Sequence, residues 1–168
     1  QTLSFFGESP FARATTYQVD LSGLRVTADS EPWVFTTPAA KIAVEDFPND
    51  AEVQPELWIK SDLDIDWSRQ LDKVALWDFE GNELYIEFVK EEKSYGFYPY
   101  RYLFACKEPL EPDSYHTLQV FEGVVAKAGP NLTKNSVEKD FHTFGALKLD
   151  GQHCDVREVY RIRAQATI

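Results

Sequence analysis

The sequence predicts an all-β protein folded as an antiparallel β-sandwich. Three observations predict it: short runs of alternating apolar and polar residues, turn-forming residues between these runs, and a pattern that occurs twice. Alternation with a period of two places every second side chain on the same face of a strand. Many short strands separated by regular turns are typical of a sandwich, whereas strands alternating with helices would indicate a parallel sheet.

The alternation is clearest in residues 16–21 and 83–89. Residues 80–82, Glu-Gly-Asn, predict a hairpin turn, because glycine adopts positive φ without steric cost. Residues 67–71 predict the one helical turn, with Asp66 as its N-cap. Further strands are expected at residues 56–60, 73–77, 98–104, 117–121 and 156–168.

One pattern near the N-terminus is repeated late in the chain. The first copy, within residues 14–37, has a polar turn, a strand opened by Tyr17, a glycine, a loop and a short strand ending in Phe-x-Thr. The second copy, within residues 109–144, has the same order, and Tyr115 opens its first strand. Such repetition predicts a protein built from similar units in tandem.

The repeat divides the chain into three parts. Residues 1–37 match the closing half of a sandwich unit, and residues 38–145 form a complete unit. Residues 146–168 are then the opening strands of a further unit, or extra edge strands of the complete one. In the alternative arrangement, both end segments pair with each other or with the central unit and complete one body. The sequence does not separate these arrangements.

Composition restricts the partners. The net charge of −11 argues against nucleic acid and against an anionic membrane surface, because both attract concentrated Lys and Arg. No apolar run reaches the roughly 20 residues that cross a bilayer, so direct membrane insertion is not expected. Because the chain contains no Met, we expect a processed or excised piece of a larger protein.

Short motifs of the second copy resemble a known module. They are Pro109-Leu110, Tyr115, Val120-Phe121-Glu122-Gly123-Val124, Gly129-Pro130-Asn131-Leu132 and Phe141-His142-Thr143. In this order they resemble the bacterial Ig-like module of surface-layer and adhesion proteins, and they are similar to the N-terminal macroglobulin-like domains of bacterial alpha-2-macroglobulins. The resemblance covers residues 10–149 and implies an Ig-like or macroglobulin-like β-sandwich. The Cys-x-Glu-Gln thioester of many alpha-2-macroglobulins is absent from this sequence.

No catalytic motif appears in the sequence, so we expect no enzymatic activity and no cofactor. A nucleophile elbow, a P-loop, a zinc-protease helix and a dinucleotide fingerprint are all missing. The alternating Asp62, Asp64 and Asp66 suggest a calcium loop, but Trp67 and Lys73 stand where an EF-hand needs Gly and Glu. We therefore interpret these carboxylates as a solvated strand face, with no metal bound.

Two features are candidate sites. Cys106 and Cys154 have no metal-ligand spacing, and they form either a disulfide in an exported protein or two separate thiols. The aromatic stretch 95–102 is the candidate binding surface, because aromatic rings on a β-surface hold a sugar or a protein. Its candidate contact residues are Tyr95, Tyr98, Tyr100 and Tyr102. One alternate half of this stretch is expected in the core.

These observations predict a non-catalytic structural or interaction module of a larger exported bacterial protein. The resemblance implies part of an alpha-2-macroglobulin-like protease-trapping protein, secreted, periplasmic or in the cell envelope. Its partners would be neighbouring domains of the same polypeptide and a protease. The first alternative is a structural or adhesive Ig-like module of a cell-surface protein. The second is a carbohydrate-binding module of a secreted hydrolase.

Overall fold

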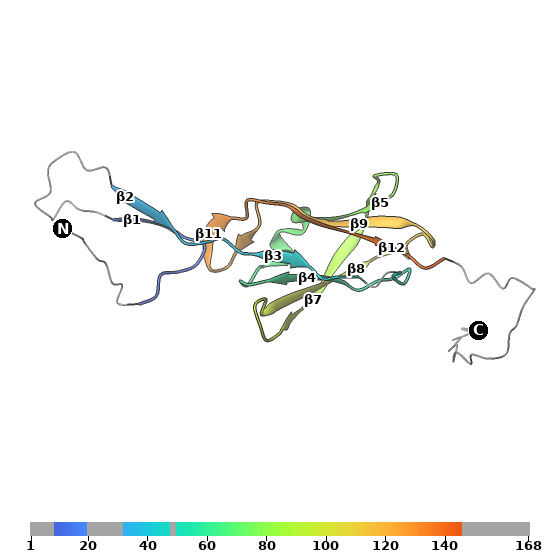
Figure 1. Cartoon of the computed structure of the whole chain (residues 1–168), viewed down its shortest axis with the longest axis horizontal. Coiled ribbons are helices and arrows are strands. Elements are labelled where there is room, and N and C mark those ends of the chain that lie inside the picture. The colour runs from blue at the N-terminus through green and yellow to red at the C-terminus, as the bar shows by residue number, and fades with distance from the viewer. Residues whose placement is uncertain (1–8, 20–31, 48–49, 146–168) are drawn as a thin grey trace, which may run out of the picture.

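The structure is a computed structural model that describes residues 9–19, 32–47 and 50–145. Regular structure in these residues is almost entirely β, with two short 3-10 helices and no α-helix. Figure 1 shows an elongated molecule in which a long hairpin near the N-terminus precedes a body of packed sheets. The predicted all-β, antiparallel sandwich is confirmed.

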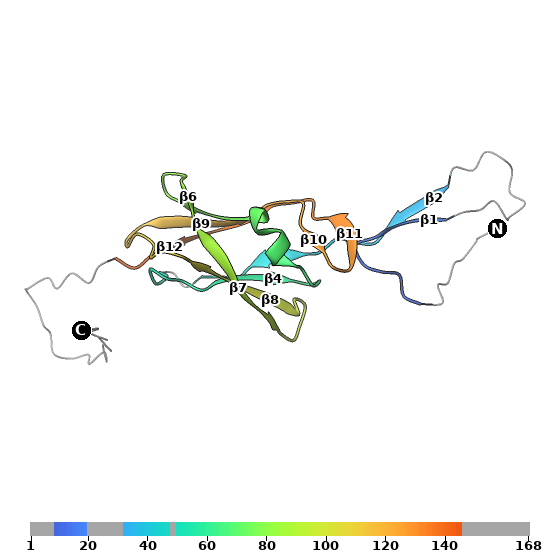
Figure 2. The ribbon, with the colours of Figure 1, turned by 180° about the vertical axis from the view of Figure 1, so that it is seen from behind.

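Two four-stranded sheets form the sandwich, and Figure 2 shows them from behind. One sheet has the order β3-β4-β8-β7, formed by Ile42–Val44, Leu57–Ser61, Tyr100–Cys106 and Ile86–Lys93. The other has the order β12-β9-β5-β6, formed by Val137–His142, Tyr115–Val120, Val74–Asp78 and Glu83–Leu84. Two smaller pairs lie outside these sheets: β1 (Thr16–Val19) with β2 (Trp33–Thr36), and β10 (Val125–Ala126) with β11 (Gly129–Leu132). Every strand ladder is antiparallel.

The core lies between the two four-stranded sheets. In β4, Leu57 and Ile59 are fully buried whereas Trp58 between them is only half-buried, as the period of two requires. Each fully buried aliphatic side chain contributes about 1.5–3 kcal/mol through removal of apolar surface from water. The large core side chains are Leu57, Ile59, Ile65, Trp67, Leu76, Tyr102, Phe104, Leu118, Val120, Val124 and Phe141.

The predicted strand at residues 83–89 is two strands in different sheets. β6 ends at Leu84 in one sheet, and β7 begins at Ile86 in the other. Tyr85, between them, is 67% exposed, because the chain crosses from one layer to the other at this residue. The turn before β6 is as predicted: Gly81 has φ of 82°, and the Asp78 carboxylate accepts hydrogen bonds from the Glu80 and Asn82 amides.

The predicted helical turn is a 3-10 helix, η1, at Trp67–Arg69, directly followed by η2 at Leu71–Lys73. Asp66 occupies the N-cap position, but its side chain accepts from the Ser68 hydroxyl and caps no backbone amide. Among the described residues, no helix has the length and apolar character needed to cross a membrane. The third predicted part of the chain, residues 146–168, and the strand predicted within it at 156–168 lie outside the described residues.

Candidate functional site: a junction between the hairpin and the sandwich

The first copy of the repeat forms a separate hairpin, β1–β2. Tyr17 is paired with Phe35 across the strands, and their rings stack with centroids 5.2 Å apart. Phe11 packs edge-on against both rings, at 5.0 Å from each. Phe11 is nevertheless 46% exposed, and Trp33 at the far end of β2 is 55% exposed. The hairpin therefore carries an apolar face that no sheet among the described residues covers.

The base of this hairpin is held by the Thr37 hydroxyl. Thr37 Oγ1 accepts a hydrogen bond from the Thr15 amide at 2.9 Å and donates to the Ala12 carbonyl at 2.8 Å. Ala14 lies inside this loop with φ of 52°, a left-handed conformation that costs a non-glycine residue about 1–2 kcal/mol. The Ala14 amide donates to the Pro38 carbonyl at 3.0 Å. We call this arrangement, made by Ala12, Ala14, Thr15 and Thr37, the first clamp.

The same arrangement occurs at the end of the sandwich. Thr143 Oγ1 accepts from the Ser114 amide at 3.1 Å and donates to the Glu111 carbonyl at 2.6 Å. Asp113 has φ of 58°, and its amide donates to the Phe144 carbonyl at 3.2 Å. We call Glu111, Asp113, Ser114 and Thr143 the second clamp. The two clamps match in backbone conformation and in hydrogen bonds, although Thr37 follows Thr15 by 22 residues and Thr143 follows Ser114 by 29. The local pattern that the sequence repeats is therefore also repeated in the structure.

The equivalence of the two tyrosines is wrong by one residue. Phe35 is paired with Tyr17, whereas Phe141 is paired with His116 and not with Tyr115. Because a shift of one residue moves a side chain to the other face of a strand, Tyr17 corresponds to the buried His116. Tyr115 is 66% exposed and packs on His142 instead.

The first clamp is docked on the β10–β11 hairpin of the sandwich. The Asn131 amide donates to the Ala14 carbonyl at 2.8 Å, and Asn131 Nδ2 donates to the Thr37 carbonyl at 3.4 Å. Thr16 Oγ1 donates in turn to Asn131 Oδ1 at 3.3 Å. One asparagine thus joins both strands of the hairpin to the sandwich, and Figure 1 shows β11 next to the base of β1–β2.

Gly129 makes this close approach possible. A Cβ atom at this position would lie 2.4 Å from Thr15 Oγ1 and 2.5 Å from the Ala14 and Arg13 carbonyl oxygens. Backbone oxygens cannot give way as a flexible side chain can, so only glycine fits. Arg13 adds an ion pair, because its guanidinium lies 2.8 Å from Asp62, which also accepts from the Lys41 amide. We call this set of contacts the junction.

The four candidate tyrosines do not form one surface. Tyr102 is fully buried, and its hydroxyl accepts from the Ile65 amide at 2.7 Å; burial raises its pKa well above the usual range. Tyr100 is packed against the same core, and Tyr98 is half-buried. Tyr95 is fully exposed at the β7–β8 turn. The predicted alternation thus places Tyr102 in the core and outside any exposed binding surface, and it leaves Tyr95 as the exposed member.

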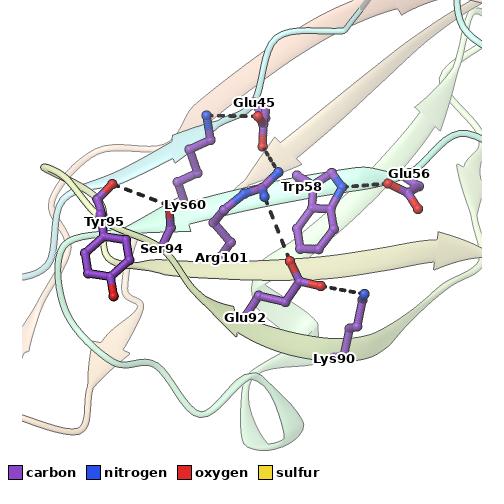
Figure 3. A network of polar contacts seen from close by, with 9 residues as sticks. All are labelled: Glu45, Glu56, Trp58, Lys60, Lys90, Glu92, Ser94, Tyr95 and Arg101. Carbon is purple, nitrogen blue, oxygen red and sulfur yellow. Dashed lines mark hydrogen bonds and ion pairs between the residues drawn. The ribbon is translucent and has the colours of Figure 1, made fainter.

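A second aromatic residue on this sheet, Trp58, is already occupied by the chain's own charges. Figure 3 shows Arg101 over the indole, with the guanidinium carbon 4.2 Å from the ring centroid and Lys90 at 5.6 Å. Arg101 also bonds Glu45 at 2.7 Å. Burial raises the pKa of Glu45, but hydrogen bonds from Arg101 and Lys60 outweigh it and leave the pKa lowered. A sugar ring would have to displace this network to stack on Trp58.

Cys106 is half-buried at the end of β8 and has no disulfide partner among the described residues, and burial raises the pKa of its thiol to about 11. Cys154, its proposed disulfide partner, lies outside the described residues. Cys106 and the buried His116 line a pocket of about 220 Å³ beside the second clamp. Neither ring nitrogen of His116 makes a well-aligned hydrogen bond within the described part of the chain.

The acidic residues of the predicted solvated face are paired with cations. Asp62 bonds Arg13, and Asp64 bonds Lys127 at 2.7 Å. The Asp66 carboxylate accepts a hydrogen bond from the Ser68 hydroxyl, and its Oδ2 lies 3.3 Å from Arg69 Nε. Within residues 9–19, 32–47 and 50–145, no group of three or more His, Cys, Asp and Glu side chains is arranged to hold a metal ion.

No protein-family model and no curated protein matches this chain.

The sequence alone does not predict the junction. Its pattern marks Gly129 and Asn131 only as turn formers, and the threonine of Phe-x-Thr only as the end of a strand. The signal that is present is the recurrence of a Phe-x-Thr ending after a short polar turn, with Thr37 22 residues after Thr15 and Thr143 29 residues after Ser114.

Proposed function

We propose that this chain is a non-catalytic structural segment of a larger exported protein, in which β-sandwich units are joined in a row through junctions between a closing hairpin and the next unit. In this proposal β1–β2 is the closing hairpin of one unit and residues 38–145 are the unit that follows. The observation that carries it is the docking of the first clamp on the β10–β11 hairpin. Such a junction would fix the angle between neighbouring units.

The exposed face of the hairpin supports the same proposal. Tyr17 and Phe35 correspond in register to His116 and Phe141, which are 2% and 5% exposed in the core of the complete sandwich. Phe11, three residues before Ala14, corresponds to Leu110, which stands at the same distance before Asp113 and is 5% exposed. An isolated two-stranded hairpin is marginally stable, so these side chains have the places of core residues in a unit that other strands would complete.

The finer identity of the larger protein is also a proposal. The motifs of the second copy support an alpha-2-macroglobulin-like, protease-trapping parent in the periplasm or cell envelope, in which rigid spacing would position the parts of a cage. A structural or adhesive module of a cell-surface protein is the alternative, because a row of sandwiches serves either purpose. The carbohydrate-binding alternative has the least support, since Tyr102 is buried and Trp58 is covered by Arg101.

The substitution Gly129→Ala tests the junction. Gly129 has no positive φ, so alanine brings no backbone strain, and its only effect is the contact of Cβ with Thr15 and the two carbonyls. We expect the hairpin to detach while the sandwich stays folded. In ¹⁵N relaxation, the order parameters of the β1 and β2 amides should then fall from about 0.85 to below about 0.6, with the β4, β8 and β9 amides unchanged.

Gly81→Ala is the matched control. Gly81 has φ of 82° and no atom within 4 Å of the added Cβ, so the substitution strains a distant turn and leaves the junction intact. Its hairpin amides should keep the order of the unsubstituted chain. If Gly129→Ala also leaves them ordered, the contacts of β11 do not hold the hairpin, and the proposed function loses its main support.

A further inference from the structure

The second clamp presents the same backbone carbonyl acceptors as the first, but no described residue donates a hydrogen bond to them. In the junction, Asn131 donates to the Ala14 and Thr37 carbonyls. The equivalent carbonyls belong to Asp113 and Thr143, and among the described residues neither accepts a hydrogen bond. Unpaired backbone acceptors at a folded loop are available for a partner that offers N–H groups.

A buried polar atom at the second clamp also lacks a partner. Ser114 is 6% exposed, and its Oγ has no hydrogen bond within the part of the chain that the structure describes. Its equivalent, Thr15 Oγ1, lies directly against Gly129 in the junction and donates within its own loop to the Arg13 carbonyl at 2.9 Å. A buried hydroxyl without a partner is destabilising by about 1–3 kcal/mol, so a donor or acceptor brought to this site would be favourable.

Exposed apolar side chains surround the second clamp. Tyr115 and Phe144 flank Ser114 and Thr143 in the sequence, and they are 66% and 55% exposed. The two clamps lie in line along the long axis: β1–β2 meets the sandwich at one end, and β12 runs toward the other (Figure 1). A partner at the second clamp would therefore extend the molecule in a row and cover these rings.

We propose that the second clamp docks the β10–β11 hairpin of a further unit of the same kind, as the first clamp docks the β10–β11 hairpin seen in this chain. A glycine of that unit would lie against Ser114, and an amide-bearing side chain would bond the Asp113 and Thr143 carbonyls. This inference rests on the proposed function. It adds that the complete unit carries both halves of the connection, a docking hairpin at one end and a clamp at the other.

The residue of positive φ differs between the two clamps. Asp113 stands where the first clamp has Ala14, and its carboxylate lies 3.5 Å from His142 Nε2. It also packs over Gly145, where a Cβ atom would lie 3.4 Å from Asp113 Cγ. The side chain therefore lies on the side of the clamp that faces β12 and the following residues. Asp113→Ala gives the second clamp the alanine that the first has at this position and should permit docking at least as tight.

The test extends the full chain by one unit. Residues 1–145 are followed directly by a second copy of residues 40–168, so that Gly145 takes the place of Ala39 and the spacing of the first junction is kept. We expect the Asn131 amide to be protected from hydrogen exchange in both copies, about tenfold or more over a solvent-exposed amide. Gly129→Ala in the second copy alone should remove protection at the second junction only.

The outcomes separate the two proposals. If the Asn131 amide of the second copy exchanges freely while that of the first copy is protected, the further inference is overturned and the proposed function stands. If Gly129→Ala in the first copy has no effect on the first hairpin, the proposed function fails independently. Separate amide spectra of the two sandwiches report whether each copy is folded.

Discussion

The two copies of the Phe-x-Thr motif have the same backbone and opposite surroundings. Phe141 stacks on Phe47 with centroids 4.3 Å apart and is 5% exposed, whereas the described aromatic partners of Phe35 are Tyr17 in its own hairpin and the exposed Phe11. Yet Thr37 and Thr143 make equivalent hydrogen bonds. The difference teaches that the clamp is a local device, formed by a few residues whether or not a core lies beneath it.

Burial by contrast depends on distant strands. Phe141 is covered by Phe47, which lies between β3 and β4 of the opposite sheet. It is also covered by His116 of β9, whose ring centroid lies 5.5 Å from that of Phe141. The hairpin has no such strands among the described residues, so it depends on Asn131, Gly129 and the Arg13–Asp62 ion pair to hold its place. Substitutions at equivalent residues of the two copies should therefore change the free energy of unfolding by different amounts.

The largest expected difference is between Phe141→Ala and Phe35→Ala. Removing a buried phenylalanine from a core costs about 3–5 kcal/mol, so Phe141→Ala should lower the free energy of unfolding of the sandwich by that amount. Phe35 lies outside the core, so Phe35→Ala should change it by less than about 1 kcal/mol and loosen only the hairpin. Urea denaturation followed by tryptophan fluorescence, with Trp67 buried in the core, measures both. Equal effects of the two substitutions would mean that the hairpin is part of the sandwich core.

Removal of the clamp hydroxyls of Thr143 and Thr37 should give a smaller difference in unfolding free energy between the two copies. Thr143→Val keeps the shape of the side chain but leaves the Ser114 amide and the Glu111 carbonyl without partners, a loss of about 1–3 kcal/mol of unfolding free energy. Thr37→Val removes the equivalent bonds of the hairpin and should increase amide exchange at Thr15 and Thr37 without moving the urea midpoint of the sandwich. Thr117→Val, on the exposed face of β9, is the matched control. A fall in the midpoint for Thr37→Val would contradict the separation of the two copies.

Much of the sandwich follows from the sequence because its causes are local. Alternation fixes which face of β4 and β9 is buried, and Gly81 fixes a hairpin turn through its positive φ. The change of layer at Tyr85 was not predictable, because the alternation continues across it from Leu84 to Ile86. Only the pairing of β6 and β7 with different partners reveals the crossing.

The junction was out of reach of the sequence for a different reason. Asn131 and Ala14 are distant in the chain, and their contact depends on how the hairpin meets β11. The tyrosine of the repeat misled the alignment because Tyr17 and Tyr115 are identical in type but not in register. The clamp residues carry the true equivalence, since Thr37 and Thr143 make the same hydrogen bonds through the same side-chain oxygen.

The smallest expected effect concerns the residue that takes the place of Tyr17 in the sandwich. Burial lowers the pKa of His116, and the nearby His142 lowers it further. A hydrogen bond to the Glu111 backbone and the Asp78 and Glu111 carboxylates raise this pKa, but by less. The neutral ring is therefore favoured in the folded state. Below the ordinary pKa of 6.5 the unfolded chain binds a proton that the folded chain does not. The free energy of unfolding should then fall as the pH drops, until the pH passes the lowered pKa of the folded state.

One proton limits this loss to about 1.4 kcal/mol per pH unit. It is measured by urea denaturation between about pH 7.5 and 5.5, above the range in which most carboxylates titrate. His116→Gln should flatten the slope, because it removes the buried ring. A slope that survives His116→Gln would assign the acid sensitivity to another group.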